Sequence, residues 1–141
     1  MISLQQLNPV TLTPAEIQKI SPSAWAYLGD AVYELYVRNY YLIPPKRSRY
    51  YHQLVVAKVR AESQAHQLDN LKPHLTNAEL DILRRGRNAA FRKPKRLDPE
   101  VYQQATSLET LIGYLYLTDP QRLNQLLSYI ELDSKLDSKL D

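Results

Sequence analysis

"WAYLGDAVYELYVR" (residues 25–38) places two acidic side chains, Asp30 and Glu34, in the middle of an apolar and aromatic segment. The apolar side chains recur at the spacing of one helical face, so the segment predicts an amphipathic helix. Like charges one helical turn apart cost only about 0.2–0.5 kcal/mol, so a solvated stripe is one interpretation. The other is that at least one acid points into a site that requires a carboxylate.

The rest of the chain also carries helix signals. Capping residues, two of them in capping boxes, predict helix starts at Thr13, at Ser21 or Ser23, and at Thr76, Asp98 and Asp119. Prolines predict stops after residue 43 and near residue 73, and Gly86 and Asn88 are plausible terminators of the helix that begins after Thr76. We therefore expect a short helix that begins at residue 14, and further helices near residues 22–43, 48–69, 77–86 or 77–88, 99–117 and 120–132. The expected buried positions are Leu28, Ala31, Val32, Leu35, Leu54, Ala57, Val59, Ala61 and Ala65.

No alternating strand pattern is present, so the predicted fold class is all-α. A chain of 141 residues is one domain of ordinary size, which we place at residues 1–132. The repeat in "ELDSKLDSKLD" predicts a frayed or disordered tail at residues 133–141.

Composition excludes several kinds of chemistry. The chain has no cysteine, which excludes thiolate chemistry and fits a cytoplasmic location, and 3 glycines, too few for a phosphate-binding glycine-rich loop. His52, His66 and His74 lack metal-ligand spacing and are interpreted as structural or surface residues. No apolar run approaches the roughly 20 residues of a membrane span, and no secretory signal is visible.

The net charge of +3 conceals a concentrated basic segment, "RRGRNAAFRKPKR", at residues 84–96. It contains no acid, and the remainder of the chain carries 11 basic against 15 acidic residues. We expect a loop here that binds a polyanion, although a solvated loop is the alternative. The expected nucleic-acid contacts are Arg84, Arg85, Arg87, Asn88, Arg92, Lys93, Lys95 and Arg96.

A second acid, Glu109, lies in the apolar stretch "SLETLIGYLYL", one turn before Gly113. A mid-helix glycine costs about 1 kcal/mol relative to alanine and usually marks the close approach of another backbone. If that backbone belongs to residues 25–38, Asp30 and Glu109 converge. Two carboxylates inside a helical bundle require cations or a metal, and such oxygen ligands select Mg²⁺ or Mn²⁺ over zinc.

The two helix motifs together resemble the ribonuclease III family. "YLGDAVYELYVR" is similar to its signature helix and "ETLIGYLYL" to its second active-site helix. "LRRGRNA" between them, and the short length without a double-stranded-RNA-binding domain, resemble the mini-ribonuclease III branch. Two of the family's four active-site acids are matched, by Asp30 and Glu109. Ala26 and Thr106 stand at the other two positions, and Glu34 is an open candidate to compensate.

The resemblance implies a homodimeric endonuclease of double-stranded RNA that leaves 5′-phosphate and 3′-hydroxyl ends. Asp30 and Glu109 would ligate Mg²⁺, with Mn²⁺ as a substitute, and the basic segment would hold the RNA backbone. The implied substrate is the precursor of 23S ribosomal RNA, trimmed at both ends with or without assistance from a ribosomal protein.

Two other classes of function remain open from the sequence. One is a catalytically inert RNA-binding module on the same fold, an interpretation that the loss of two acids leaves open. The other is a DNA-binding helical domain with "LDILRRGRNA" as its recognition helix, an interpretation that leaves Asp30 and Glu109 without a role.

Overall fold

The structure, a computed structural model, describes residues 11–90 and 97–132, and all the regular secondary structure in these ranges is helical. The elements are α1 (Pro14–Gln18), α2 (Pro22–Leu42), α3 (Ser48–Val59), α4 (Ala61–Leu71), the 3₁₀ turn η2 (Lys72–His74), α5 (Asn77–Ala89), α6 (Pro99–Thr118) and α7 (Pro120–Leu127). The predicted all-α class is confirmed. No described helix is long and apolar enough to cross a membrane.

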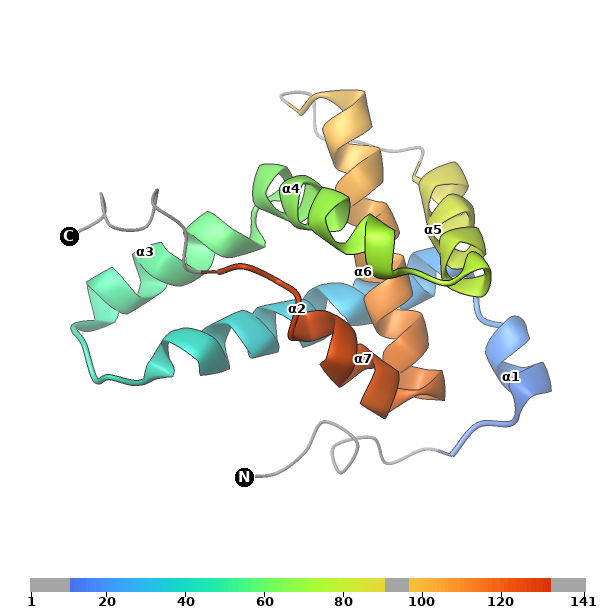
Figure 1. The fold of residues 1–141 in the computed structure, drawn as a ribbon, viewed down its shortest axis with the longest axis horizontal. Coiled ribbons are helices and arrows are strands. Elements are labelled where there is room, and N and C mark those ends of the chain that lie inside the picture. The colour runs from blue at the N-terminus through green and yellow to red at the C-terminus, as the bar shows by residue number, and fades with distance from the viewer. Residues whose placement is uncertain (1–10, 91–96, 133–141) are drawn as a thin grey trace.

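Helices α2 and α6 cross at the centre of the molecule, and the other elements pack around them (Figure 1). Helices α4 and α5 lie against α6, α3 runs back along α2, and α7 packs against the end of α6. The core between them holds large side chains with no exposed surface, among them Trp25, Tyr33, Leu108 and Leu123. Such burial contributes roughly 1.5–3 kcal/mol for each large apolar side chain.

The predicted helix starts are confirmed at each of the capping residues. Thr13 and Thr76 form complete capping boxes with Glu16 and Glu79. The side chains of Ser21, Asp98 and Asp119 accept hydrogen bonds from the first turns of α2, α6 and α7. These caps satisfy backbone N–H groups that a helix cannot pair internally, so they fix where each helix begins.

The single helix predicted over residues 48–69 is wrong, because the chain breaks into α3 and α4 at Arg60. This residue is extended, with φ −70° and ψ 157°. The break interrupts the hydrogen bonding of the helix backbone. The side-chain amide nitrogen of Gln64 donates a hydrogen bond to the Val59 carbonyl at 2.8 Å. Nothing in the local sequence marks the break, because neither glycine nor proline is present there.

The predicted terminator Gly86 is also wrong, because α5 continues through it to Ala89. Gly86 packs against α6, where a Cβ atom would lie 2.4 Å from the Thr110 hydroxyl oxygen. The first half of the basic segment is therefore helical, not a loop. Residues 91–96 and the tail at 133–141 lie outside the described residues.

The last helix is shorter than predicted, since α7 ends at Leu127 and not at residue 132. Tertiary hydrogen bonds hold the following chain against the core. Gln67 bonds both the N–H and the carbonyl of Glu131, and the Tyr41 hydroxyl donates to the Leu132 carbonyl at 2.9 Å. Ile130 and Leu132 are buried, so this segment gains more from packing than from helical continuation.

Three predictions of burial are confirmed and one is wrong. Val32, Leu54 and Ala65 are buried, whereas Ala31 is exposed. The remaining five are only half-buried: Leu28, Leu35, Ala57, Val59 and Ala61. The face of α2 that is most buried instead carries Trp25, Gly29, Tyr33 and Val37, and its glycine allows α6 to approach.

Candidate active site

The site is built where α2 and α6 cross backbone to backbone. A Cβ atom on Gly29 would lie 1.8 Å from the backbone oxygen of Glu109, and one on Gly113 would lie 1.8 Å from that of Trp25. No side chain fits at either position, so only glycine permits this crossing. The prediction that Gly113 marks the close approach of another backbone is confirmed, and that backbone is the helix that contains Trp25 and Gly29.

This crossing brings Asp30 and Glu109 to one recess, with a volume of about 370 Å³. Residues one or two turns apart on a helix share a face, so Tyr27 of α2 and Tyr102 of α6 also line it. The other lining residues are Ser23, Ala26, Ala89, Ala90 and Thr106. The recess is open to solvent on the outside and closed by the helix crossing on the inside.

The two carboxyl groups occupy different environments. Asp30 is exposed, whereas Glu109 is half-buried beneath it. Burial, together with a hydrogen bond to Asp30 and its charge, raises the pKa of Glu109 to about 9, and a hydrogen bond from Gln64 opposes that rise. The Tyr33 hydroxyl is fully buried nearby without a partner among the described residues, and burial raises its pKa above its ordinary value.

The pair suits a hard divalent cation. Its donors are carboxylate oxygens, and no described lysine or arginine forms an ion pair with either acid. The described residues contain no group of three or more acids or histidines that could enclose a metal. Mg²⁺ does not require such a cage, since one or two carboxylates plus water and substrate phosphates commonly hold it.

Comparison with known proteins decides what this recess belongs to. The family description "Ribonuclease III domain" matches residues 23–120, which include both crossing helices. The chain belongs to the ribonuclease III family. It is an endoribonuclease of the ribonuclease III type, and the all-α fold is the one that this family shares.

Similar proteins are mini-ribonucleases of this family. The chain is 59% identical over 119 residues to "Mini-ribonuclease 3" of Synechococcus sp., covering 84% of this chain and 86% of the relative. It is 57% identical to that of Synechocystis sp., covering 89% and 87% of the two chains. A crystal structure of a protein from Fusobacterium nucleatum superposes with a TM-score of 0.73 at 29% identity, covering 79% of this chain and 93% of that one.

Within this ribonuclease III domain, all four positions that the signature motifs single out line the same recess. Ala26 and Asp30 face it from α2, and Thr106 and Glu109 face it from α6. The two positions at which the resemblance leads one to expect acids therefore lie beside Asp30 and Glu109, where Ala26 and Thr106 carry no charge.

We expect Glu109→Gln to stabilise the ribonuclease fold while it removes cleavage. The folded-state pKa of about 9 lies above the ordinary value of 4.5, so ionisation opposes folding. The contribution of Glu109 to stability is fully present below pH 4.5 and is lost as the pH rises through about 9. At pH 8 the variant should gain roughly 1–3 kcal/mol in the free energy of unfolding. Urea unfolding at pH 5 and pH 8 measures this gain, and a variant less stable at pH 8 contradicts it.

Glu34, the open candidate for a third acid, lies in a different recess. It forms an ion pair with Arg38 at 3.0 Å and lines a shallow groove between α2 and α3 with Tyr51 and His52. The groove is separate from the one that holds Asp30 and Glu109. All three histidines are exposed, and His74 stacks on Tyr129.

The described half of the basic segment is engaged within the fold. Arg84 pairs with Asp81, and Arg87 donates to both oxygens of Glu100 at 2.8 and 2.6 Å. Arg85 is half-buried, with its guanidinium 4.9 Å from the Trp25 ring centre. Asn88 is exposed at the end of α5. Arg92, Lys93, Lys95 and Arg96 lie outside the described residues.

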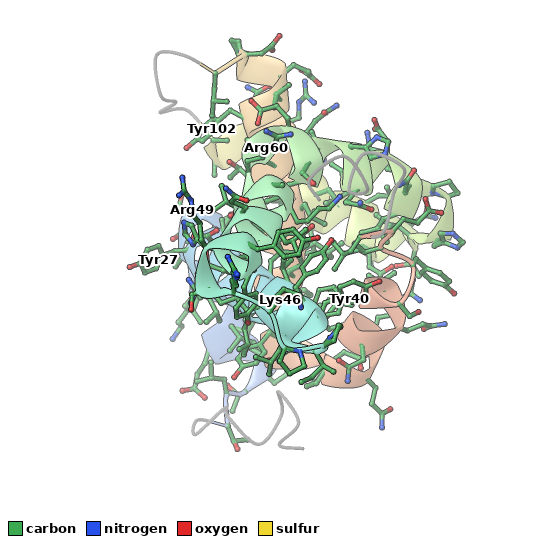
Figure 2. The ribbon with its side chains drawn as sticks, turned by 90° about the vertical axis from the view of Figure 1, so that its left-hand side faces the viewer. Tyr27, Tyr40, Lys46, Arg49, Arg60 and Tyr102 are labelled. Carbon is green, nitrogen blue, oxygen red and sulfur yellow. The ribbon has the colours of Figure 1, made fainter. Side chains whose placement is uncertain are left out.

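Sequence reasoning missed a second basic stretch, "KRSRYYHQLVVAKVR" at residues 46–60, which contains five cations and no acid. In the structure Arg49 and Arg60 are exposed, and no described carboxylate forms an ion pair with either. Figure 2 shows both on the same side of the molecule as Tyr27 and Tyr102 of the recess. The absence of acids was the signal available in the sequence.

Proposed function

We propose that this ribonuclease cuts both strands of double-stranded RNA with the help of Mg²⁺ held by Asp30 and Glu109. The observation that carries the proposal is the pair of carboxylates, one exposed and one half-buried, which the helix crossing holds together without a cationic partner among the described residues. Mn²⁺, another hard cation, should substitute for Mg²⁺.

The two acids have separate tasks in this proposal. Glu109, on the inner wall, provides a ligand whose backbone the crossing fixes in place, and Asp30, at the solvent side, faces the incoming phosphodiester. A divalent cation bound there supplies water activation and screening of the charge on the scissile phosphate. Because the recess opens to solvent, the wide and shallow minor groove of A-form RNA can bring a backbone phosphate to it.

Cations around the recess hold the RNA backbone in this proposal. Arg49 and Arg60 are exposed and do not pair with any described acid. The sequence alone adds Arg92, Lys93, Lys95 and Arg96 to the expected contacts, and these four lie outside the described residues. Arg84, Arg87 and Asn88 are exposed and keep donors free beyond their internal pairs. Arg85, which packs on Trp25, serves the fold.

The expected effect of removing these cations is weaker binding with unchanged chemistry. Replacing Lys93, Lys95 and Arg96 by alanine, or Arg49 and Arg60 by alanine, should lower affinity for all duplex sequences about equally. The log–log salt slope should fall by roughly one unit for each phosphate that the variant no longer binds. Single-turnover cleavage against RNA concentration at two salt concentrations measures both effects. Unchanged affinity with a collapsed maximal rate contradicts this assignment.

We also propose a two-fold dimer, since two equivalent sites suit a two-stranded substrate. Large apolar side chains on and around α2 and α3 are exposed in the single chain: Tyr27 is 84% exposed, Ile43 69%, Leu42 51% and Val56 45%. A second copy would cover such a face at the same time as it places a second recess nearby.

Tyr27→Arg is expected to convert the dimer to a monomer, because it places a charge at the most exposed of these four side chains. Sedimentation velocity at micromolar concentration measures the change. Leu80→Arg is the matched control, since Leu80 is an exposed apolar residue that lies on α5 and is not one of these four side chains. A wild-type monomer, or equal effects of the two variants, overturns the proposed interface.

The natural substrate we propose is the precursor of 23S ribosomal RNA, in line with the mini-ribonuclease branch that the sequence resembles. The decisive experiment compares double-stranded RNA, single-stranded RNA and duplex DNA, each with Mg²⁺ and with a chelator. Cleavage of double-stranded RNA alone, dependent on Mg²⁺, supports the proposal. Binding of RNA without cleavage identifies an inert RNA-binding module, and a preference for DNA identifies a DNA-binding domain. A precursor with 23S ends, with and without ribosomal protein, then tests the substrate.

A further inference from the structure

Arg87, in the last turn of α5, and Glu100, in the first turn of α6, form an ion pair whose geometry the proposed function leaves unexplained. The Arg87 guanidinium donates one hydrogen bond to each oxygen of the Glu100 carboxylate, at 2.8 and 2.6 Å. Such a two-point contact fixes direction as well as distance, because both groups are planar. The pair therefore holds the end of one helix in a defined position against the start of the next (Figure 1).

This ion pair lies directly behind one wall of the recess. Ala89 and Ala90, two and three residues after Arg87, line the recess at the end of α5, and Tyr102, two residues after Glu100, lines it from α6. The pair itself is not part of the lining. Residues two apart on a helix do not face the same way, so the pair supports this wall from its other side. It can hold the wall in place without occupying the space that a phosphate enters.

Helix α5 is held at both of its ends by ion pairs with other helices. At its start Glu79 pairs with Arg122 of α7, and these side chains are only 10% and 19% exposed. At its end the side chains of Arg87 and Glu100 are 45% and 51% exposed. An exposed pair changes the folding equilibrium constant by about fivefold or less. Stability alone is therefore a weak reason for the second pair, and its place behind the recess is a stronger one.

We infer that the Arg87–Glu100 pair is a positioning clamp, which fixes the wall formed by α5 and α6 so that the scissile phosphate meets the two carboxylates in a productive orientation. A displacement of about 1 Å at a reacting group can lower the rate about 100-fold. The clamp uses two of the five guanidinium N–H groups, so Arg87 keeps donors for the RNA backbone. The inference rests on the proposed cleavage of double-stranded RNA at this recess.

Removal of Glu100 separates the clamp from a simple effect of charge. Glu100→Ala removes an acid near the proposed RNA path, so charge alone would strengthen duplex binding and leave the maximal rate unchanged. The clamp predicts that single-turnover cleavage at saturating RNA and Mg²⁺ falls about tenfold, while duplex affinity does not fall. Asp81→Ala is the matched control, since Asp81 is an acid of α5 whose partner, Arg84, lies on the same helix. An unchanged maximal rate in Glu100→Ala, or an equal loss in Asp81→Ala, overturns the inference.

Arg87→Lys tests the two-point geometry of the clamp. Lysine keeps the positive charge but cannot form the paired hydrogen bonds of a guanidinium. The maximal rate should therefore fall as it does in Glu100→Ala. A protein with both substitutions should be no slower than either single variant, because both remove the same contact. Losses that multiply in the double variant would show that the two residues act separately, and would overturn the clamp.

Amide hydrogen exchange tests the clamp without a cleavage assay. In Glu100→Ala the amides of residues 88–90, at the end of α5, should exchange about two- to fivefold faster than in the wild type. The amides of residues 80–82, near the start of the same helix, should exchange at the wild-type rate. Unchanged exchange at residues 88–90 refutes the clamp. A wild-type protein that does not cleave double-stranded RNA refutes the proposed function instead, and the exchange result then still decides whether the clamp exists.

Discussion

Asp30→Asn should remove cleavage of double-stranded RNA, by a factor on the order of 10³ or more, while the fold and RNA binding are retained. The substitution keeps the shape of the side chain and removes the negative charge that the cation requires. Asp30 is exposed, so the free energy of unfolding should change by no more than about 0.5 kcal/mol. Single-turnover cleavage, duplex binding and urea unfolding measure the three quantities on the same preparation.

Glu34→Gln is the matched control for this prediction. It removes a carboxylate one turn along the same helix, where the acid pairs with Arg38 in a separate groove. We expect this variant to cleave at close to the wild-type rate. A near wild-type rate in Asp30→Asn refutes the assignment of the metal ligand, and a collapsed rate in Glu34→Gln adds that acid to the site.

The largest expected effect on stability comes from Gly113→Ala. The added Cβ atom would lie 1.8 Å from the Trp25 backbone oxygen, and neither helix backbone can move out of its way without separating α2 from α6. Alanine normally stabilises a helix relative to glycine by about 0.5–1 kcal/mol. Here we expect a loss of at least about 3 kcal/mol in the free energy of unfolding, which urea denaturation measures.

Ala31→Gly separates the effect of packing from that of helix propensity. Ala31 is exposed in the middle of α2, so the change should cost only about 1 kcal/mol. A Gly113→Ala protein as stable as wild type would show that the helices do not cross backbone to backbone. If Gly113→Ala folds at low temperature, its cleavage should still be impaired, because the crossing also sets the separation of Asp30 and Glu109.

Local chemistry made the helix starts predictable from the sequence. Thr13, Thr76 and Asp98 satisfy backbone groups within a few residues of themselves, so their role does not depend on the rest of the fold. The close approach at Gly113 was predictable for a related reason, since a glycine in a helix interior has a cost that packing must offset.

Two of the features that sequence reasoning missed depend on distant parts of the chain. The early end of α7 is stabilised by Gln67 and Tyr41. Gly86 looked like a terminator because its partner, Thr110, lies on another helix. None of these partners can be identified from the residues that surround the feature itself.

The candidate site also has some features that the sequence predicts and others that only the fold reveals. The helical spacing and the resemblance of two motifs pointed to Asp30 and Glu109, and the structure places both in one recess. The basic segment was visible as a run of charge, but the internal pairs of Arg84 and Arg87 required the fold.

The crossing at Gly29 and Gly113 also bears on when the protein first becomes a nuclease. Asp30 and Glu109 lie far apart along the chain, and only the docking of α2 on α6 brings them together. Under the proposed function, a partly folded chain in which α2 has not yet docked on α6 lacks the site for the cation. The return of cleavage during refolding should therefore report the moment at which the two glycines meet.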